Sequence, residues 1–260
     1  MSPIYVPGKV TLRQTWQPMD PDAAAYITAV ETVDGQALEE KVKIAIDNFV
    51  IGCKADGIWS AIKASCILAG ARTLDGALVP LVGTAPTNYN FVSGDYDRET
   101  GLVGDGSTKY LDSNRNNNAD PQDSKHLAIY QSSLATFSSL LIATTNISGR
   151  SALISLTPGG ISSRINSDVV TANNGNAVGF VGGVRTSSTA TSARVGGADF
   201  PKTVTSQSPV NQNLGVFASG SGAFKSNARL AFYSIGESLD LAALDTRVTD
   251  LINAIGVAIP

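Results

Sequence analysis

Residues 90–114 read NFVSGDYDRETGLVGDGSTKYLDSN, a stretch of short apolar and polar segments separated by turn residues. Asp105-Gly106 is a strong turn signal, because glycine adopts the left-handed backbone that tight turns need. We expect strands at Asn90–Val92 and Lys109–Asp112, on either side of this turn. From Thr84 onward the chain repeats the same pattern, which indicates a mainly β domain.

The remaining strands are predicted from hydrophobic residues at alternate positions, which mark strands with one buried face. They are His126–Gln131, Ser139–Ala143, Ala152–Leu156, Ser162–Ile165, Ala177–Val181, Ala193–Gly196, Asn213–Ala218 and Ala228–Ile235. Turn residues separate them, for example at 158–160, 173–175 and 219–222. Many short strands without intervening helices favour an antiparallel β-sandwich or jelly roll over residues 84–260.

Residues 21–83 are expected to be helical and to form an anchoring region. Asp20 and Pro21 begin a helix, because Asp caps a helix N-terminus and proline is tolerated at the first position. A second helix is predicted from Gln36 to Ile51, ended by Gly52. A third is predicted to begin at Asp56 and to carry the apolar residues Ile58, Trp59, Ile62 and Cys66.

A final helix is predicted from Asp240 to Ile255. Its apolar residues alternate spacings of three and four: Leu241, Leu244, Val248, Leu251 and Ile255. This heptad stripe has two interpretations, a strand of a coiled coil or a helix packed on the sandwich. Two heptads are too few for an independent coiled coil, so packing on the sandwich is favoured.

The second helix carries Leu38, Val42, Ile46 and Phe49 on one broad apolar stripe. A stripe of this width has to be covered. Because the neighbouring helices are short, we predict that residues 21–70 form a homo-oligomeric contact through these side chains, with a trimer as the favoured assembly.

Residues 1–20 are expected to form an extended arm, because three prolines there oppose helix formation. The arm carries Tyr5 and Trp16, large aromatic side chains that need a surface to cover them. Either the arm folds back on its own domain, or it docks on a neighbouring protein. The second alternative makes Tyr5 and Trp16 candidate docking residues.

Composition excludes several classes of partner. Charged residues make up 16% of the chain, the formal net charge is −3, and no basic block is present. Nucleic-acid binding through phosphate neutralisation is therefore not expected. No apolar run approaches the length of a membrane span, and the first residues do not read as a signal peptide. We expect neither membrane insertion nor Sec secretion.

The two cysteines, Cys53 and Cys66, both lie in apolar surroundings of the expected helical region. A disulfide between them is geometrically possible. Lone cysteines on apolar faces are more commonly buried thiols, and the reduced state is therefore favoured.

No catalytic constellation is evident. His126 is the only histidine and has no nucleophile motif beside it, so we expect a structural or surface role. One histidine and two cysteines make no zinc site. Asp95, Asp97, Glu99, Asp105 and Asp112 could serve glycoside hydrolysis, but turn formation accounts for them.

The oxygen-rich residues between 95 and 123, among them Asn117, Asp120 and Asp123, could also ligate calcium. They lack the fixed spacing of a calcium loop. No nucleotide-binding glycine motif is present either. We therefore expect no metal and no cofactor.

Three segments carry a family resemblance. They are residues 34–86, which begin DGQALEEKVK; residues 90–130, NFVSGDYDRETGLVGDGSTKYLDSNRNNNADPQDSKHLAIY; and residues 228–255, ARLAFYSIGESLDLAALDTRVTDLINAI. Their amino-acid sequences resemble those of a group of bacteriophage virion proteins, many from environmental and cyanobacterial phages. The resemblance implies a laminin-G-like, concanavalin-type sandwich on a structural component of the particle, often at the tail and often trimeric.

Three functions remain open at this point. The leading one is a non-enzymatic tail fibre or baseplate-associated adhesin, whose low-charge, amide-rich sandwich meets glycans of the host surface. The second is a capsid decoration protein that binds across neighbouring capsomers, holds them together and needs no ligand. The third is a polysaccharide depolymerase, which would need two facing carboxylates.

Overall fold

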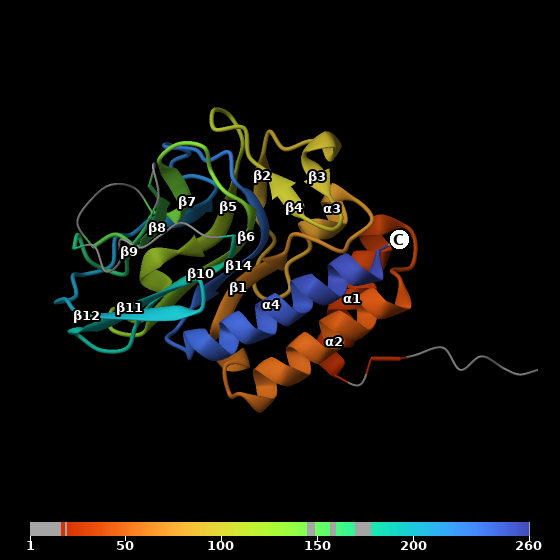
Figure 1. Ribbon diagram of the computed structural model, residues 1–260, viewed down its shortest axis with the longest axis horizontal. Helices are drawn as coiled ribbons and strands as arrows, with labels where there is room; N and C mark the ends of the chain where they lie inside the picture. Colours follow the sequence, from red (N-terminus) through yellow and green to blue (C-terminus); the bar gives the residue numbers. More distant parts are fainter. Residues whose placement is uncertain (1–16, 19, 145–148, 157–159, 170–177, 260) are drawn as a thin grey trace, which may run out of the picture.

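Two antiparallel β-sheets, packed face to face, carry the fold, and a layer of helices covers one of them (Figure 1). The structure is a computed structural model and describes residues 17–18, 20–144, 149–156, 160–169 and 178–259. The predicted mainly β, antiparallel sandwich is confirmed. Tyr5 and Trp16, predicted on an arm, lie outside the described residues.

The larger sheet, called sheet A, has strand order β12-β11-β10-β6-β14-β4-β3, with β1 also pairing with β14. Its strands are β12 (Ala198–Thr203), β11 (Ala190–Val195), β10 (Gly179–Arg185), β6 (Lys125–Ser133), β14 (Arg229–Gly236), β4 (Gly101–Val103), β3 (Tyr96–Asp97) and β1 (Ile62–Ile67). The long central strands β6, β10 and β14 are almost wholly buried, because both faces of this sheet are covered.

The other sheet, called sheet B, has strand order β2-β5-β13-β7-β8-β9. Its strands are β2 (Thr87–Tyr89), β5 (Tyr110–Asn116), β13 (Asn213–Val216), β7 (Ser139–Ala143), β8 (Ala152–Ser155) and β9 (Ile161–Arg164). Their inward side chains, such as Leu111, Leu153 and Val216, meet those of sheet A in an inner core.

Most predicted strands coincide with observed ones, but the first does not. That strand was predicted at Asn90–Val92, but the observed strand β2 lies before it and ends at Tyr89. Asn90 takes a left-handed backbone with φ 67° and turns the chain there. Strands β3, β4 and β12 were not predicted, since the first two are very short and β12 is mostly exposed.

The predicted third helix is wrong. Asp56 ends the preceding helix instead of beginning a new one, and only a short 3-10 turn, η1 (Trp59–Ala61), precedes β1. Residues of β1 alternate between two cores: Ala64 and Cys66 lie in the inner core, whereas Ile67 lies on the helix side of sheet A. Ile62 also lies on the helix side, because the pairing register shifts between Ile62 and Ala64. Pairing with β14 supplies the backbone hydrogen bonds that a helix would otherwise make.

Three long helices, α1 (Pro21–Asp34), α2 (Glu40–Ala55) and α4 (Leu241–Ala258), form the third layer. Asp20 caps α1 and Asp240 caps α4, as predicted. Helix α2 begins later than predicted and passes through Gly52 without ending. A Cβ there would lie 2.7 Å from Cδ of Arg247 on α4, so this glycine lets the two helices approach closely.

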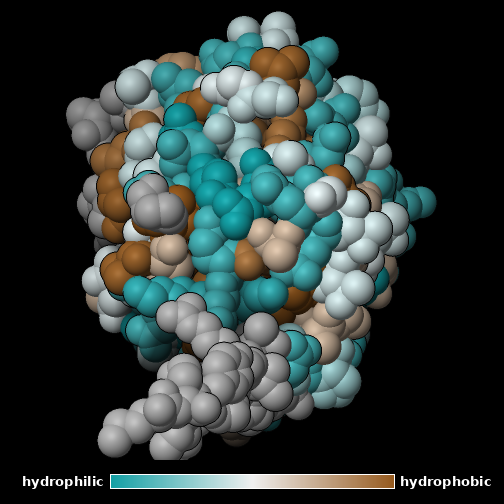
Figure 2. Space-filling view, turned by 90° about the vertical axis from the view of Figure 1, so that its right-hand side faces the viewer, coloured by the Kyte–Doolittle hydropathy of each residue, from teal (hydrophilic) through white to brown (hydrophobic). Residues whose placement is uncertain are grey.

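Short elements connect the layers. They are helix α3 (Leu74–Ala77) and the 3-10 turns η2 (Ser93–Asp95) and η3 (Asn117–Ala119). Figure 1 shows α2 and α4 running side by side over sheet A. Figure 2 looks onto the end of the molecule that carries the chain's C-terminus, where hydrophilic residues occupy the middle of the face.

The apolar stripe of α2 is covered within the chain. Leu38, Val42, Ile46 and Phe49 are at most 4% exposed, in an outer core shared by the helices and sheet A. The ring of Phe49 meets that of Phe232 on β14 edge to face, with centroids 5.8 Å apart. The prediction that these four side chains form an oligomer contact is therefore corrected, because α4 and sheet A already cover them.

The division at residue 83 is corrected as well, since β1 belongs to the sandwich and the helices share a core with it. Cys53 and Cys66 are buried free thiols, as favoured, and lie in different cores on opposite sides of sheet A. In the part of the chain that the structure describes, no helix has the length and apolar character needed to span a bilayer.

Candidate functional site

In the described part of the chain, the three long helices cover sheet A, and no helix lies over the outer face of sheet B (Figure 1). A hollow of about 210 Å³ lies on this face, over strands β7, β8 and β9. Its lining consists of Leu140, Ala143, Thr144, Arg150, Ala152, Ile154, Arg164 and Phe224. A concave, mainly apolar surface with a few polar groups is the usual form of a ligand site.

Strand register explains the floor of the hollow. Leu140 of β7 pairs with Ile154 of β8, and Ala152 pairs with both Ala143 of β7 and Arg164 of β9. Residues directly opposite one another share a face of a sheet, so these side chains form two cross-strand rows. The two alanines leave the space of the hollow, and the leucine and isoleucine make its apolar part.

One wall of the hollow is Phe224. It belongs to the turn 219–225, which lies over β13: a Cβ on Gly215 would be 2.3 Å from the carbonyl oxygen of Ser219. The Phe224 carbonyl accepts a hydrogen bond from the backbone N–H of Leu140 at 3.0 Å, which attaches the turn to β7.

The conformation of Phe224 is unusual. Its φ is 54°, in the left-handed region that is unfavourable for a large side chain, and the residue is 67% exposed. Strained backbone persists where the surroundings enforce it, and such residues gather at functional sites. An exposed aromatic ring held beside a hollow is therefore a candidate ligand contact.

Two arginines make the hollow positive. Arg150 Nε lies 3.7 Å from Asp168 Oδ1, and Arg164 Nε donates to the Asp168 carbonyl oxygen at 3.1 Å. Burial lowers the pKa of Arg164, and the charge of Arg150 lowers it further. A guanidinium nevertheless stays charged at neutral pH. Two cations thus lie near the single carboxylate of Asp168, and only Arg150 is paired with it, in a chain whose formal net charge is −3.

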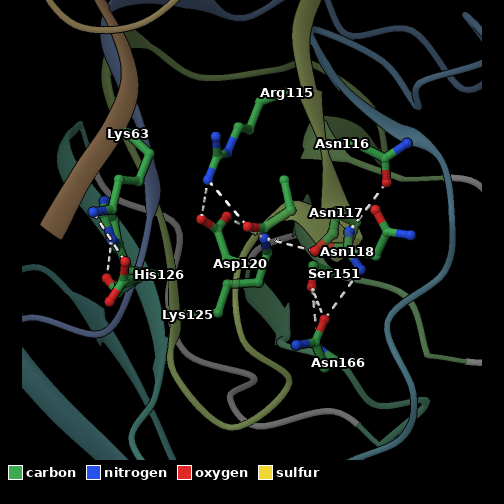
Figure 3. A network of polar contacts seen from close by, with 12 residues as sticks. Lys63, Arg115, Asn116, Asn117, Asn118, Asp120, Lys125, His126, Ser151 and Asn166 are labelled. Carbon is green, nitrogen blue, oxygen red and sulfur yellow. Dashed lines mark hydrogen bonds and ion pairs between the residues drawn. The ribbon is translucent and has the colours of Figure 1, made fainter.

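A buried polar network holds the strand ends that carry these arginines (Figure 3). Ser151 follows Arg150, and Asn166 lies two residues after Arg164. Ser151 Oγ donates to Asn166 Oδ1 at 2.9 Å, and the Asn166 N–H donates back to that hydroxyl at 3.1 Å. Asn117 Nδ2 donates to the same Asn166 oxygen at 3.1 Å.

The network continues into a buried ion pair (Figure 3). Lys125 Nζ lies 2.9 Å from Asp120 Oδ2 and 3.2 Å from the Asn117 carbonyl oxygen, to which it donates. Arg115 binds the other carboxylate oxygen. Burial raises the pKa of Asp120, but the charge of Lys125 and the bond from Arg115 bring it below its usual value. Burial lowers the pKa of Lys125, and the neighbouring Asp120 carboxylate opposes that shift. The contacts of Lys125 and Arg115 with Asp120, and of Lys125 with Asn117, fix η3 beside the strand ends.

A second group of side chains lies near the turn 219–225, on the β5 side. Tyr89 of β2 and Tyr110 of β5 stack with centroids 4.4 Å apart, and Tyr89 is 40% exposed. Lys225 Nζ lies 5.6 Å from the centroid of Tyr110, and a Cβ on Gly222 would touch the same ring. The outer face of sheet B thus combines the hollow with an aromatic patch.

His126 has a structural role, as predicted. It is fully buried; Nδ1 lies 2.6 Å from the Glu237 carbonyl oxygen and Nε2 2.8 Å from Ser234 Oγ. Burial lowers its pKa to about 4. A carbonyl only accepts, so the neutral ring donates from Nδ1 and accepts the hydroxyl proton at Nε2. Ser234 is also fully buried, so this pair is out of reach of a substrate.

The aspartates of residues 90–114 serve turns, as predicted. Asp105 Oδ1 accepts from three successive backbone N–H groups, of Ser107, Thr108 and Lys109. Asp97 accepts in the same manner from Thr100 and its neighbour. Among the residues that the structure describes, no group of three or more His, Cys, Asp or Glu side chains could hold a metal ion.

Among the described side chains that were singled out from the sequence, none lines the hollow. The functional candidates that were missed are Arg150, Arg164 and Phe224. One signal was present, an isolated aromatic residue inside the Gly/Ser-rich run SGSGAFKSN, residues 219–227. The arginines stand 14 positions apart, and only strand pairing shows that they are neighbours.

No protein-family model matches this chain, and no curated protein sequence matches it. Among solved structures, a botulinum neurotoxin serotype D binding domain aligns with a TM-score of 0.51 and 9% identity, over 73% of this chain and 51% of that one. At this identity the likeness concerns the fold, and it agrees with the sandwich described above.

Two other structures align less closely. A Trypanosoma rangeli sialidase in complex with sialic acid has a TM-score of 0.46 and 11% identity, over 76% of this chain and 34% of that one. A Ruminococcus gnavus IT-sialidase CBM40 bound to alpha2,3 sialyllactose has a TM-score of 0.36 and 12% identity, over 52% of this chain and 83% of that one. This chain spans about half of the neurotoxin domain and about a third of the Trypanosoma enzyme.

Proposed function

We propose that this protein is a non-enzymatic component of a bacteriophage particle, part of a tail fibre or baseplate, that attaches to saccharides of the host surface. The observation that carries the binding role is the hollow on the outer face of sheet B, with Phe224 held in strained backbone at its wall. The particle and the tail position rest on the resemblance of residues 34–130 and 228–255 to phage virion proteins.

Binding without catalysis is supported by the chemistry of the hollow. Of the described residues that line it, none carries a carboxylate. Glycoside hydrolysis uses two carboxyl groups on either side of the scissile bond. The aspartates of residues 90–114 bind backbone N–H groups of their own turns instead.

The test uses a panel of immobilised bacterial lipopolysaccharides and capsular polysaccharides. Wild-type protein is compared with Ala152→Leu, which fills the hollow, and with the control Val257→Ser, which changes an 80%-exposed apolar residue on α4. We expect Ala152→Leu to weaken binding by at least about tenfold and the control to bind normally. Circular dichroism confirms that both variants are folded.

Two results would overturn the proposal: wild-type protein that binds no member of the panel, or an Ala152→Leu variant that binds as well as wild type. Copy number in purified particles tests the tail position. A protein that covers the whole capsid would support the decoration role instead.

A further inference from the structure

We infer that the hollow takes the anionic group of an acidic saccharide, a carboxylate or a phosphate, and that Arg150 and Arg164 bind it. The inference rests on the proposed saccharide binding and names the chemical class of the ligand.

The first argument is charge. The two guanidinium groups have one carboxylate, Asp168, between them, and Asp168 itself is 43% exposed. The other lining side chains, from Leu140 to Phe224, are neutral. The hollow therefore has a surplus positive charge on low-dielectric walls, which concentrates an anion there.

The second argument is unused hydrogen-bonding capacity. Arg164 donates from Nε to the Asp168 carbonyl, and no hydrogen bond or ion pair to a described residue engages its two Nη atoms. Arg150 makes a long ion pair at 3.7 Å and donates no hydrogen bond to any residue that the structure describes. A planar guanidinium matches carboxylate and phosphate oxygens in a bidentate manner.

The third argument is pre-organisation. Arg164 is fixed opposite Ala152 by strand register, and the ends of β8 and β9 are locked by the Ser151–Asn166–Asn117 hydrogen bonds. The backbone that carries both arginines therefore needs little ordering when a ligand binds. Phe224, Leu140 and Ile154 offer apolar surface to the uncharged part of the same ligand.

The size of the hollow limits the ligand. Its volume of about 210 Å³ is smaller than the 300–1,000 Å³ typical of sites for drug-sized molecules. It therefore suits one acidic sugar residue or one phosphorylated sugar, with the rest of a glycan lying along the open face towards Tyr89 and Tyr110.

The experiment measures binding to an array of neutral, uronate-bearing and phosphate-bearing saccharides. The variants are Arg164→Gln and Arg150→Gln, with Lys41→Gln as a control of equal charge change on an exposed lysine of α2. We expect wild type to bind at least one acidic class at least about tenfold more tightly than its neutral counterpart, with weaker binding at high salt. Each arginine variant should lose that preference, and Lys41→Gln should keep it.

The two acidic arms distinguish a carboxylate ligand from a phosphate ligand. Arg164→Lys keeps the charge but not the planar fork, so it should bind the acidic ligand less tightly than wild type. Equal binding of neutral and acidic saccharides that is abolished by Ala152→Leu would overturn this inference and leave the proposed function standing. Binding to no saccharide at all would overturn both.

Discussion

At the scale of single residues, His126 and Phe224 show opposite uses of burial. His126 has no exposed surface and satisfies both ring nitrogens inside the protein. Phe224 keeps an exposed ring in an unfavourable backbone conformation. His126 stabilises the sandwich, whereas the backbone strain at Phe224 is of the kind that is found at binding sites.

His126 predicts a pH dependence of stability. Its pKa is about 4 in the folded protein and about 6.5 in an unfolded chain, so the unfolded state binds more protons between these values. The contribution of His126 to the free energy of unfolding is therefore fully present above pH 6.5. It falls as the pH drops towards 4, by up to about 3 kcal/mol.

Urea unfolding at pH 7 and pH 5 measures this effect. His126→Gln should be less stable at pH 7, because two buried hydrogen bonds change, but should lose much less stability between the two pH values. An equal fall in both proteins would show that His126 is not the group responsible.

Phe224→Asn separates strain from binding. Asn tolerates the left-handed backbone better than phenylalanine, so the variant should be as stable as wild type or up to about 1 kcal/mol more stable. It should also bind saccharides at least about tenfold less tightly, because the aromatic wall is gone. Thermal unfolding and the polysaccharide panel measure the two effects, and a clear loss of stability would contradict the first.

At the scale of elements, α2 and β1 show how context decides structure. The stripe of α2 is buried by α4 and sheet A, and β1 becomes a strand because β14 offers it an edge. Both outcomes depend on residues more than 160 positions later in the chain, so local periodicity indicates neither.

Phe49→Ala tests whether the apolar stripe of α2 is buried within the same chain. Removal of a buried aromatic ring should destabilise the protein by about 3–5 kcal/mol. Because Phe49 packs on Phe232 of the same chain, the mass of the folded protein in sedimentation should equal that of wild type. A change of oligomeric mass without loss of stability would restore the idea of an oligomer contact.

At the scale of the whole molecule, the helices and the sandwich share one outer core. A fragment of residues 84–260 lacks β1, α1 and α2, and leaves apolar side chains such as Phe180, Phe232 and Leu244 uncovered. We expect it to aggregate or to bind a hydrophobic dye, with weak, uncooperative unfolding. A fragment of residues 17–260 is the control and should unfold cooperatively. A soluble, cooperative 84–260 fragment would show that the sandwich is a separate domain.

The sequence by itself was enough for features that depend on neighbours along the chain. The caps at Asp20 and Asp240, the turn at Asp105-Gly106 and most strands of the sandwich follow from backbone preferences and from alternating hydrophobicity, which act over a few residues. They suffice to predict a mainly β antiparallel fold and a final packed helix.

Only the tertiary structure decided the candidate site, because the hollow and its lining depend on pairing between distant segments of the chain. The register of β7, β8 and β9 brings Arg150 and Arg164 to the hollow, and the turn over β13 adds Phe224 from 60 residues further on. An outward arginine in a strand looks the same in sequence whether or not a second one lies beside it. Only the folded sheet determines which outward side chains share a surface, and that surface is the candidate binding site.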